Sequence, residues 1–494
     1  MALRISLLAA IATLVMVAPA SAAVGTFHSF AGPEGETPAA PLVQGVDGFL
    51  YGVAAHGGDF NVLPPDGAGT IFRTDGSGNL KALHLFNGLD GAVPTGIVQG
   101  RDGAFYGTTM YGGVPDITVL TPGNGTIFRM DANGNVSRLF VFPGGELGYR
   151  PGPLMQGSDG ALYGTAVGGS TLYIPGIVYR FDPVTRDYRI LHTFVTREGR
   201  YLDGKNPSGK PFQARDGFFY GTTLQGGPWN AGVVYKIDAA GNFAVFHAFD
   251  TFEGSEAKAG VFQAGDGSFY GTLEQGGYGG KIFRLDAAGN FTTVFAFGPY
   301  SADGWRPISN PIEGRDGFLY GTTPRGGTSP AGSYGVVYRL SRSGTLTVLH
   351  SFSGTDGISP WSSLVQASDG VLYGSTIVGG AFGLGTLFKL APAAPAPQPL
   401  PRLAGLTILP AQVHGGTRTT GTLTLNGAAP PGGASVALSS NSLHASVPGT
   451  VTVPAGASTA SFSVATWPTQ LTRVVTITAR YNGSQVSATL TITH

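Results

Sequence analysis

The sequence predicts an all-β protein in which a seven-bladed β-propeller is followed by a small immunoglobulin-like β-sandwich. A phrase of the form DGFLYG recurs seven times, four short apolar runs accompany each copy, and residues 403–494 change to a different pattern of short alternating runs. Four short strands repeated about every 50 residues is the period of a propeller blade. A repeat of this kind spreads one architecture over a long stretch of chain.

Each repeat contains the same submotifs in a fixed order. An apolar strand with aromatic ends, such as LHLF at 83–86, is followed by a short apolar run that ends just before the Asp-Gly phrase. The Asp-Gly pair supplies the positive φ angles of a tight hairpin, and a strand of the form GTIFR comes next. Turns such as DANGN at 131–135 then connect back to the next aromatic strand. Periodicity and turn chemistry agree, as they should in a foldable repeat.

The two ends of the repeat region complement each other. Residues 24–30 read as a fourth strand without the three that should precede it, whereas the last repeat stops near residue 391 after three strands. We therefore expect residues 24–30 to complete the last blade, so that residues 24–391 form a closed ring without an open sheet edge.

The pattern changes after the last repeat. Residues 392–402 form an Ala/Pro tract that is typical of an extended, semi-rigid spacer. Residues 403–494 alternate apolar and small polar residues in short runs separated by Gly, Pro and Asn turns. About ninety residues of this kind predict an immunoglobulin-like sandwich without its disulfide, serving as a spacer or as a second contact surface.

The first residues are typical of a secretory signal. Arg4 is followed by an apolar run from Ile5 to Val17 and by Ala20-Ser21-Ala22, the spacing that a signal peptidase accepts, so residues 1–22 are predicted to be a cleaved signal peptide. The alternative, a membrane anchor, is disfavoured because a bilayer span needs about 20 apolar residues. The predicted location is therefore outside the cytoplasm: extracellular, periplasmic or on the cell surface.

Composition excludes several classes of function. The chain has 29 basic and 29 acidic residues, so it has no overall field that would gather nucleic acid, and a nucleic-acid partner is not expected. It has no cysteine, which excludes disulfides, Cys-ligated zinc and a Cys nucleophile. We expect a monomer with no membrane span after signal removal.

The phrase LYGTT..GG....GTIFR.D..G.....LHSF.G.DG..P...LVQ..DG resembles the GloVer-type tandem repeats of exported bacterial proteins, over roughly residues 24–391. The resemblance implies a secreted repeat protein and supplies no reaction. The C-terminal part resembles bacterial immunoglobulin-like modules.

Residues that recur around the ring are predicted to be scaffold. Five histidines occupy one strand position in five repeats, and the seven Asp-Gly aspartates are explained as turn caps whose neighbouring tyrosines fill space between blades. The motifs of nucleophile elbows, phosphate loops, zinc helices and EF-hands do not occur. The prediction is therefore no catalytic residue, no metal and no cofactor.

The connections that differ between repeats are the predicted binding surface, because rigid aromatic side chains on exposed loops of a fixed scaffold build binding sites. The candidate residues are Trp229, Trp305, Trp361, Tyr149, Tyr173, Tyr201, Tyr300, Arg150, Asp303 and Asp356.

A second interpretation is that these aromatic rings fold back over the blades. If they are exposed, they suit a glycan, an interpretation that leans against an enzyme. A protein partner or a structural role in the envelope is the alternative, and a propeller glycan hydrolase or lyase is a second one, because propellers host enzymes as well as binders.

Overall fold

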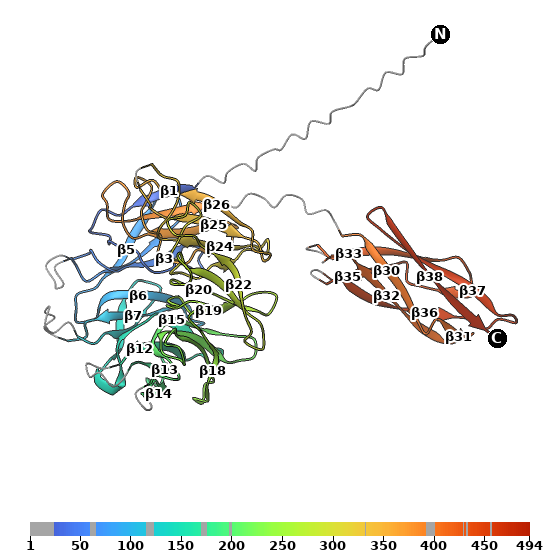
Figure 1. The fold of residues 1–494 in the computed structure, drawn as a ribbon, viewed down its shortest axis with the longest axis horizontal. Helices are drawn as coiled ribbons and strands as arrows, with labels where there is room; N and C mark the ends of the chain where they lie inside the picture. Colours follow the sequence, from blue (N-terminus) through green and yellow to red (C-terminus); the bar gives the residue numbers. More distant parts are fainter. Residues whose placement is uncertain are drawn as a thin grey trace, which may run out of the picture. The chain divides into compact units, whose positions relative to one another are not determined.

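We describe a computed structural model of the chain (Figure 1). It describes residues 24–59, 66–114, 123–168, 175–196, 200–330, 332–391, 401–427, 429–430, 433–454 and 457–494. The predicted signal peptide and most of the predicted spacer lie outside these residues. The chain divides into two compact units, Met1–Ala393 and Ala394–His494.

The described part of the first unit consists of seven antiparallel sheets, which we number as repeats 1 to 7. Repeats 1 to 3 comprise β2 (Val43–Gln44), β3 (Leu50–Ala54), β4 (Thr70–Thr74) and β5 (Leu80–Leu85); β6 (Ala92–Gln99), β7 (Phe105–Tyr111), β8 (Thr126–Met130) and β9 (Val136–Val141); and β10 (Tyr149–Pro151), β11 (Met155–Gln156), β12 (Leu162–Val167), β13 (Ile177–Phe181) and β14 (Tyr188–Thr193). A 3-10 turn, η1 (Gly145–Leu147), precedes β10.

Repeats 4 to 7 have the same order. They comprise β15 (Lys205–Gln213), β16 (Phe219–Gln225), β17 (Val233–Ile237) and β18 (Phe243–Ala248); β19 (Val261–Gln263), β20 (Phe269–Leu273), β21 (Lys281–Leu285) and β22 (Phe291–Ala296); β23 (Ile312–Glu313), β24 (Leu319–Thr323), β25 (Val336–Leu340) and β26 (Leu346–Ser351); and β27 (Val365–Gln366), β28 (Leu372–Thr376) and β29 (Thr386–Leu390).

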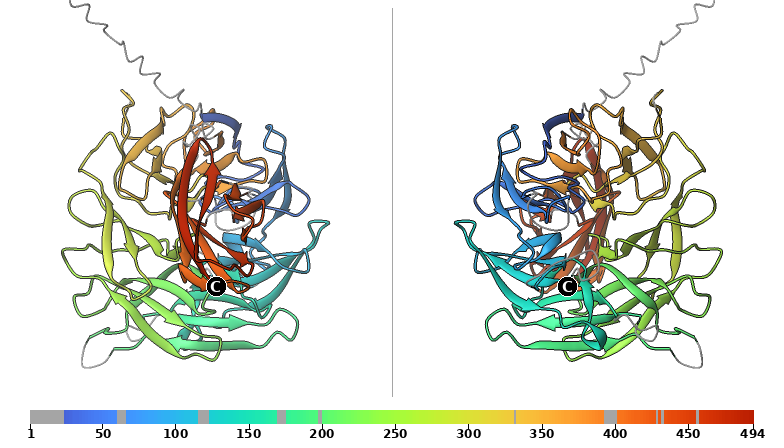
Figure 2. Two further views of the ribbon diagram at one scale, coloured as in Figure 1. Left: turned by 90° about the vertical axis from the view of Figure 1, so that its right-hand side faces the viewer. Right: turned by 90° about the vertical axis from the view of Figure 1, so that its left-hand side faces the viewer.

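The sheets succeed one another in chain order around a common centre (Figure 2). Where successive repeats contact each other through their strands, the first strand of one repeat lies against the first or second strand of the preceding repeat, as β6 does against β2 and β3. The fourth strand of repeat 7 is β1 (Val24–Ser29), which pairs antiparallel with β29 from Val24↔Leu390 to Ser29↔Thr386. The two ends of the repeat region therefore share one sheet.

The Asp-Gly phrase forms the same tight corner in all seven repeats. One carboxylate oxygen of each aspartate accepts the backbone N–H two residues later, and the other accepts the hydroxyl of the tyrosine four residues later at 2.7–3.0 Å. The interpretation of these aspartates as turn caps is confirmed. Burial, then the hydrogen bond to Asp159, raises the pKa of Tyr163 to about 12.

The tyrosine rings also connect neighbouring repeats. The ring of Tyr163 stacks on Phe219 of the next repeat with centroids 3.8 Å apart, and Tyr51 and Tyr220 pack in the same way on Phe105 and Phe269. The prediction that these rings fill space between repeats is confirmed for these three pairs.

Neighbouring repeats are also joined by a ring of hydrogen bonds. Each bond involves the last residue of a first strand. The side chain of this residue accepts a backbone N–H from the turn of the preceding repeat, at distances of 2.6–3.1 Å. The seven bonds are Val46 to Gln99, Arg101 to Gln156, Ser158 to Gln213, Arg215 to Gln263, Gly265 to Glu313, Arg315 to Gln366 and Ser368 to Gln44. The last bond returns to the first repeat, so the circuit is closed. We call it the glutamine ring.

In repeat 6 a glutamate, Glu313, replaces the glutamine, and an arginine compensates for the missing hydrogen-bond donor. In the other six repeats the glutamine amide also donates to the glycine carbonyl of its own Asp-Gly turn. Glu313 has no amide hydrogen to donate. Arg342 of the same repeat pairs with Glu313 and directs its Nε to the Gly317 carbonyl instead, while its guanidinium also pairs with Asp266 of repeat 5.

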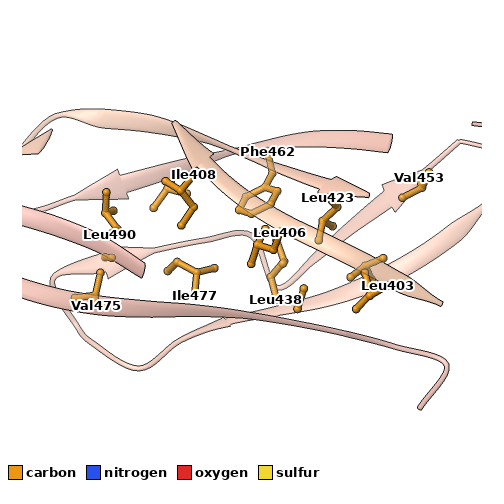
Figure 3. Close-up of a cluster of buried hydrophobic side chains, with 14 of the residues drawn as sticks. Leu403, Leu406, Ile408, Leu423, Leu438, Val453, Phe462, Val475, Ile477 and Leu490 are labelled. Atoms are coloured by element: carbon orange, nitrogen blue, oxygen red, sulfur yellow. The ribbon is translucent and has the colours of Figure 1, made fainter. Parts of the chain in front are cut away.

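The second unit consists of two sheets. One has the strand order β30 (Leu403–Leu409), β32 (Arg418–Leu425), β36 (Thr459–Thr466), β34 (Ala445–Ser446); the other has the order β31 (Gln412–His414), β38 (Ser484–Thr493), β37 (Arg473–Tyr481), β33 (Ala434–Ser440), β35 (Thr450–Val453). Leu406, Leu423 and Phe462 of the first sheet meet Ile477 and Leu490 of the second in a shared apolar core (Figure 3). Alternation of buried and exposed residues along each strand places every second side chain in this core.

Among the described residues, no helix has the length and apolar character needed to cross a membrane.

We expect Gln156→Ala to lower the free energy of unfolding of the first unit by about 1–2 kcal/mol, because it removes one hydrogen bond between repeats and one within the turn. Chemical denaturation monitored by circular dichroism measures this change. Gln225→Ala, which truncates an exposed glutamine of the same unit, is the control. An equal effect of the two substitutions would show that the glutamine ring does not contribute to stability.

Candidate functional site

The connections that differ between repeats emerge together on one face of the first unit. Because successive strands are antiparallel, the short Asp-Gly turns and the turns between third and fourth strands lie at one end of each sheet. The connections between second and third strands, and those between repeats, lie at the other end. We call the latter end the variable face.

Exposed aromatic side chains of the first unit gather on the variable face. Six large aromatic residues are exposed there: Trp229, Phe252, Tyr278, Tyr300, Trp361 and Phe382. Among the described residues of the opposite turns, the only exposed large apolar side chains are those of Val46 and Val184. Aromatic side chains exposed on one face and missing from the other indicate a contact surface.

Four aromatic residues lie on adjoining connections of repeats 5 and 6. Lys281 Nζ donates to the Phe252 carbonyl at 2.6 Å, and Gly279, next to Tyr278, packs against the backbone of residues 297 and 298. The Tyr300 ring, 83% exposed, lies 5.0 Å from that of Trp305. Phe252, Tyr278, Tyr300 and Trp305 are the aromatic cluster.

Trp305 is the base of this cluster. Its ring packs against the core of repeats 5 and 6, and its Nε1 donates to Ser333 Oγ at 3.3 Å. Trp305 therefore folds back over the scaffold, as the second interpretation of the predicted rings expects. Its neighbour Tyr300 is exposed.

Trp229 and Tyr201 lie on adjoining connections of repeat 4. Trp229 is 56% exposed, whereas Tyr201 is partly buried, with Lys205 Nζ 4.8 Å from the centre of its ring. The Tyr201 carbonyl accepts the Gly227 N–H at 2.7 Å, which holds the two connections together.

Tyr149 and Arg150 also come together, with a partner that the sequence analysis missed. The Arg150 guanidinium lies 5.7 Å from the Tyr149 ring and 4.9 Å from the ring of Tyr111, the last residue of β7. An arginine between two tyrosine rings is held by cation–π contacts while its hydrogen-bond donors stay exposed.

Trp361 lies apart from these groups, whereas Asp303 lies on the same connection as Tyr300 and Trp305. Trp361 is 47% exposed and lies on the connection that leads into β27, the first strand of repeat 7. Asp303 is exposed, and its backbone N–H donates to Ser301 Oγ at 3.1 Å. Tyr173 lies outside the described residues.

Asp356 belongs to a recurring structural pair. Five fourth-strand histidines each face a carboxylate of the following connection: His28 with Glu34 at 3.4 Å, His84 with Asp90 at 2.7 Å, His192 with Asp203 at 3.0 Å, His247 with Glu253 at 2.8 Å and His350 with Asp356 at 2.7 Å. Phenylalanine takes the same place in repeats 2 and 5. Burial alone would raise the pKa of Asp356, but hydrogen bonds from His350 and Ser353 outweigh it and lower the pKa.

The prediction that the repeated histidines are satisfied scaffold residues is confirmed for the four that make hydrogen bonds, His84, His192, His247 and His350. His28 approaches Glu34 without a hydrogen bond to its Nε2. Because Asp356 shares this role with four other acids, we assign it to the scaffold and not to the binding surface.

Where each connection between repeats leads into the first strand of a repeat, one residue has a left-handed backbone conformation. Seven non-glycine residues at equivalent positions have φ between 50° and 61°: Thr37, Val93, Arg150, Asn206, Glu256, Arg306 and Ser359. Such φ values are rare for non-glycine residues. Six of the seven donate their backbone N–H to the preceding repeat at 2.7–3.0 Å, which offsets the strain.

Six of these residues precede a proline that packs on the preceding repeat. At Gly176 (φ 140°), for example, an added Cβ would lie 2.2 Å from Cδ of Pro207, so only glycine fits. The backbone of this ring is therefore constant while its side chains vary in charge and size. We call it the left-handed ring.

Charge is concentrated on the left-handed ring of repeats 5 and 6. Glu274, at the end of β20, is 5% exposed and pairs with both Lys258 and Arg306, which come from successive connections between repeats. Lys258 also lies 3.5 Å from Glu256. The other repeats have only apolar residues at the position of Glu274, such as Met110 and Leu224. Two acids and two bases thus form a neutral, densely polar group.

Sequence reasoning missed most of this arrangement. A signal for the left-handed ring was present, since a variable residue precedes proline in six repeats. In the sequence, the aromatic residues Phe252, Tyr278 and Phe382 depart from the repeated pattern. The sequence does not show that their side chains are exposed. Among the described residues, no three His, Asp or Glu side chains are grouped so that they could hold a metal ion.

We expect Glu274→Gln to lower the free energy of unfolding by about 1–3 kcal/mol at pH 7, because it leaves Lys258 and Arg306 without their carboxylate. Burial alone would raise the pKa of Glu274, but hydrogen bonding and charge from Lys258, with the charge of Arg306, outweigh it and lower the pKa. The stabilisation is thus present above the ordinary glutamate pKa of about 4.3 and is lost as the pH falls through the lowered value.

Chemical denaturation of the wild-type protein and the variant at several pH values tests this expectation. The difference between them should shrink below about pH 4. Glu146→Gln, an exposed acid on the same face, is the control. A difference independent of pH would contradict a charge-based role for Glu274.

Comparison with known proteins finds a family model that matches the repeat. The family model of the Gloeobacter/Verrucomicrobia repeat matches residues 10–154 and 301–401. A comparison with curated proteins gives no match.

Solved structures resemble the chain in fold at low identity. A gluconolactonase of Xanthomonas campestris is 12% identical over 76% of this chain and 90% of its own, with a TM-score of 0.40. PorZ, a surface component of the type-IX secretion system of Porphyromonas gingivalis, is 13% identical over 94% of this chain and 60% of its own, with a TM-score of 0.46. Regucalcin of Agrobacterium tumefaciens, a calcium-binding protein, is 16% identical over 61% and 87%, with a TM-score of 0.37.

Sequence and strand order together identify an all-β tandem-repeat protein that matches the model of the Gloeobacter/Verrucomicrobia repeat over residues 10–154 and 301–401.

Proposed function

We propose that this chain is an exported, non-catalytic binding protein, and that the variable face of its first unit binds glycan. The observation that carries this proposal is the gathering of exposed aromatic side chains on that face, while the opposite turns carry none among the described residues. Flat aromatic rings held by a rigid scaffold suit the apolar faces of sugar rings, and the polar groups beside them suit hydroxyls.

The proposal includes a closed ring of seven blades. Two observations support it: β1 pairs with β29 and so joins the ends of the repeat region, and the glutamine ring returns to repeat 1 after seven steps. A closed ring protects every sheet edge at the seam and holds the connections of the variable face at fixed spacing.

We also propose that the second unit is an immunoglobulin-like module. Its two sheets follow the orders β30-β32-β36-β34 and β31-β38-β37-β33-β35, which correspond to the ABED and GFC sheets of that fold with a short extra strand at either edge of the second sheet. Its alternating buried and exposed strands and the absence of cysteine fit such a module without its disulfide.

A neutral glycan suits the surface better than a polyanion. Arg150 lies between the rings of Tyr111 and Tyr149, whereas Lys258 and Arg306 are neutralised by Glu274. The polar groups therefore offer directional hydrogen bonds more than net charge. Export rests on the expected signal peptide at residues 1–22.

A protein partner is the second candidate, favoured by Phe252 and Phe382. Both are exposed, and neither ring carries a hydroxyl. The enzyme alternative is weakened because two acids on the connections of the variable face, Glu253 and Asp356, are paired with histidines of the scaffold.

We expect a variant with Trp229→Ala, Tyr300→Ala and Trp361→Ala to be retained about tenfold or more weakly on the glycans that the secreted form binds. Each substitution removes an aromatic ring and its large contact area. A polysaccharide and glycan array measures retention. Trp305 is left in place, because its ring and its bond to Ser333 support the scaffold.

Trp467→Ala removes a similarly exposed tryptophan from the second unit and serves as the control. Equal retention of the triple variant and the native protein would place the glycan site elsewhere. A native protein that is retained by no glycan on the array would favour the protein partner, to be identified by copurification.

A further inference from the structure

The charge of the second unit differs from that of the whole chain. Residues 401–494 contain four arginines, Arg402, Arg418, Arg473 and Arg480, and no lysine, aspartate or glutamate. The remainder of the chain holds 25 of the 29 basic residues and all 29 acidic residues. The balance of the whole chain therefore conceals a second unit without any acidic side chain.

The exposed apolar side chains of this unit gather at one end. Five large apolar residues are exposed among its described residues: Leu409, Leu443, Trp467, Leu471 and Val474, with Leu443 at 96%. The loops that carry them meet at the end opposite to the start of β30. The Trp467 N–H donates to the His444 carbonyl at 3.1 Å, and Gly415 packs against Trp467 and Pro468.

The remaining members of the group lie beside these loops. Leu409 pairs with Thr420 near the start of β32, and Val474 is the second residue of β37. Two of the four arginines belong to the same end, since Arg418 begins β32 and Arg473 begins β37. Both are exposed. Leu409, Leu443, Trp467, Leu471 and Val474 together with Arg418 and Arg473 form the apolar tip.

We propose that the apolar tip docks on the anionic surface of a phospholipid bilayer. Leucine and tryptophan side chains on loops can enter the boundary between headgroups and acyl chains, where tryptophan is favoured, while arginines at the same level bind phosphate. A unit without acidic side chains meets no repulsion from such a surface.

A hydrated anionic polymer is a poorer partner for this tip. Its phosphate, sulfate or carboxylate groups would satisfy Arg418 and Arg473, but it has no apolar layer to cover Leu443 and Leu471. An anionic bilayer offers both within one interface. The docking is independent of glycan binding, because it uses residues of the other unit.

The test is sedimentation of the secreted form, without the expected signal peptide, with vesicles of phosphatidylglycerol and phosphatidylcholine and with vesicles of phosphatidylcholine alone. We expect sedimentation with the anionic vesicles that weakens as salt is raised. Leu443→Ser with Leu471→Ser should weaken partition by about tenfold or more, since each leucine loses the free energy of apolar burial. Arg418→Gln with Arg473→Gln should weaken it by about tenfold or more.

Two matched controls locate the effect. Arg402→Gln with Arg480→Gln removes the same charge from residues outside the tip, and Val46→Ser with Val184→Ser removes exposed apolar side chains from the first unit. Both should retain most of the binding. Equal losses for tip and control variants would overturn the proposal, as would no sedimentation with anionic vesicles.

A second measurement reports insertion directly. Fluorescence of the secreted form should be quenched by brominated phosphatidylcholine in anionic vesicles. Trp467→Phe should remove most of that quenching. Quenching that persists in Trp467→Phe would overturn the assignment of the tip. Retention on immobilised dextran sulfate without binding to anionic vesicles would overturn the bilayer in favour of a polyanionic polymer.

Discussion

The first unit depends on one hydrogen bond repeated between neighbouring repeats. A backbone N–H in the turn of one repeat is accepted by the last side chain of the next repeat's first strand, and seven such bonds return to their start. Each bond alone is worth about 1 kcal/mol. Because a change in the angle between two repeats would have to be absorbed by the others, the closed circuit restrains all of them. The replacement in repeat 6 supports this view, since Arg342 supplies the donor that Glu313 lacks.

The same constraint explains how the variable face can differ so much between repeats. Turn caps, tyrosines and the glutamine ring fix the sheets without using the connections of that face, and the histidine–carboxylate pairs use only one acid of a connection. At its inner edge the left-handed ring keeps one backbone conformation and accepts side chains as different as Val93, Arg150 and Glu256. A scaffold that tolerates such variation is the usual basis of a recognition surface.

The two units differ in their surface chemistry. The first combines exposed aromatic rings with paired charges, such as the buried Glu274 with Lys258 and Arg306. The second has no acidic side chain and collects its exposed apolar residues at one end. We therefore propose different partners for the two units, a glycan for the first and an anionic bilayer for the second.

The sequence by itself determined the repeat, its turns and its strands. The Asp-Gly corners, the scaffold role of the repeated histidines and the position of the variable connections all follow from periodicity, because local turn chemistry recurs wherever the phrase recurs. Only the tertiary structure decided which side chains are exposed and which are paired. Trp305 packs on the core while Tyr300 beside it is exposed, Asp356 faces His350, and Glu274 meets cations from two different connections. The contacts of Trp305 and Glu274 join residues of different repeats or connections, and a periodic pattern carries no information on how unlike loops fold against one another.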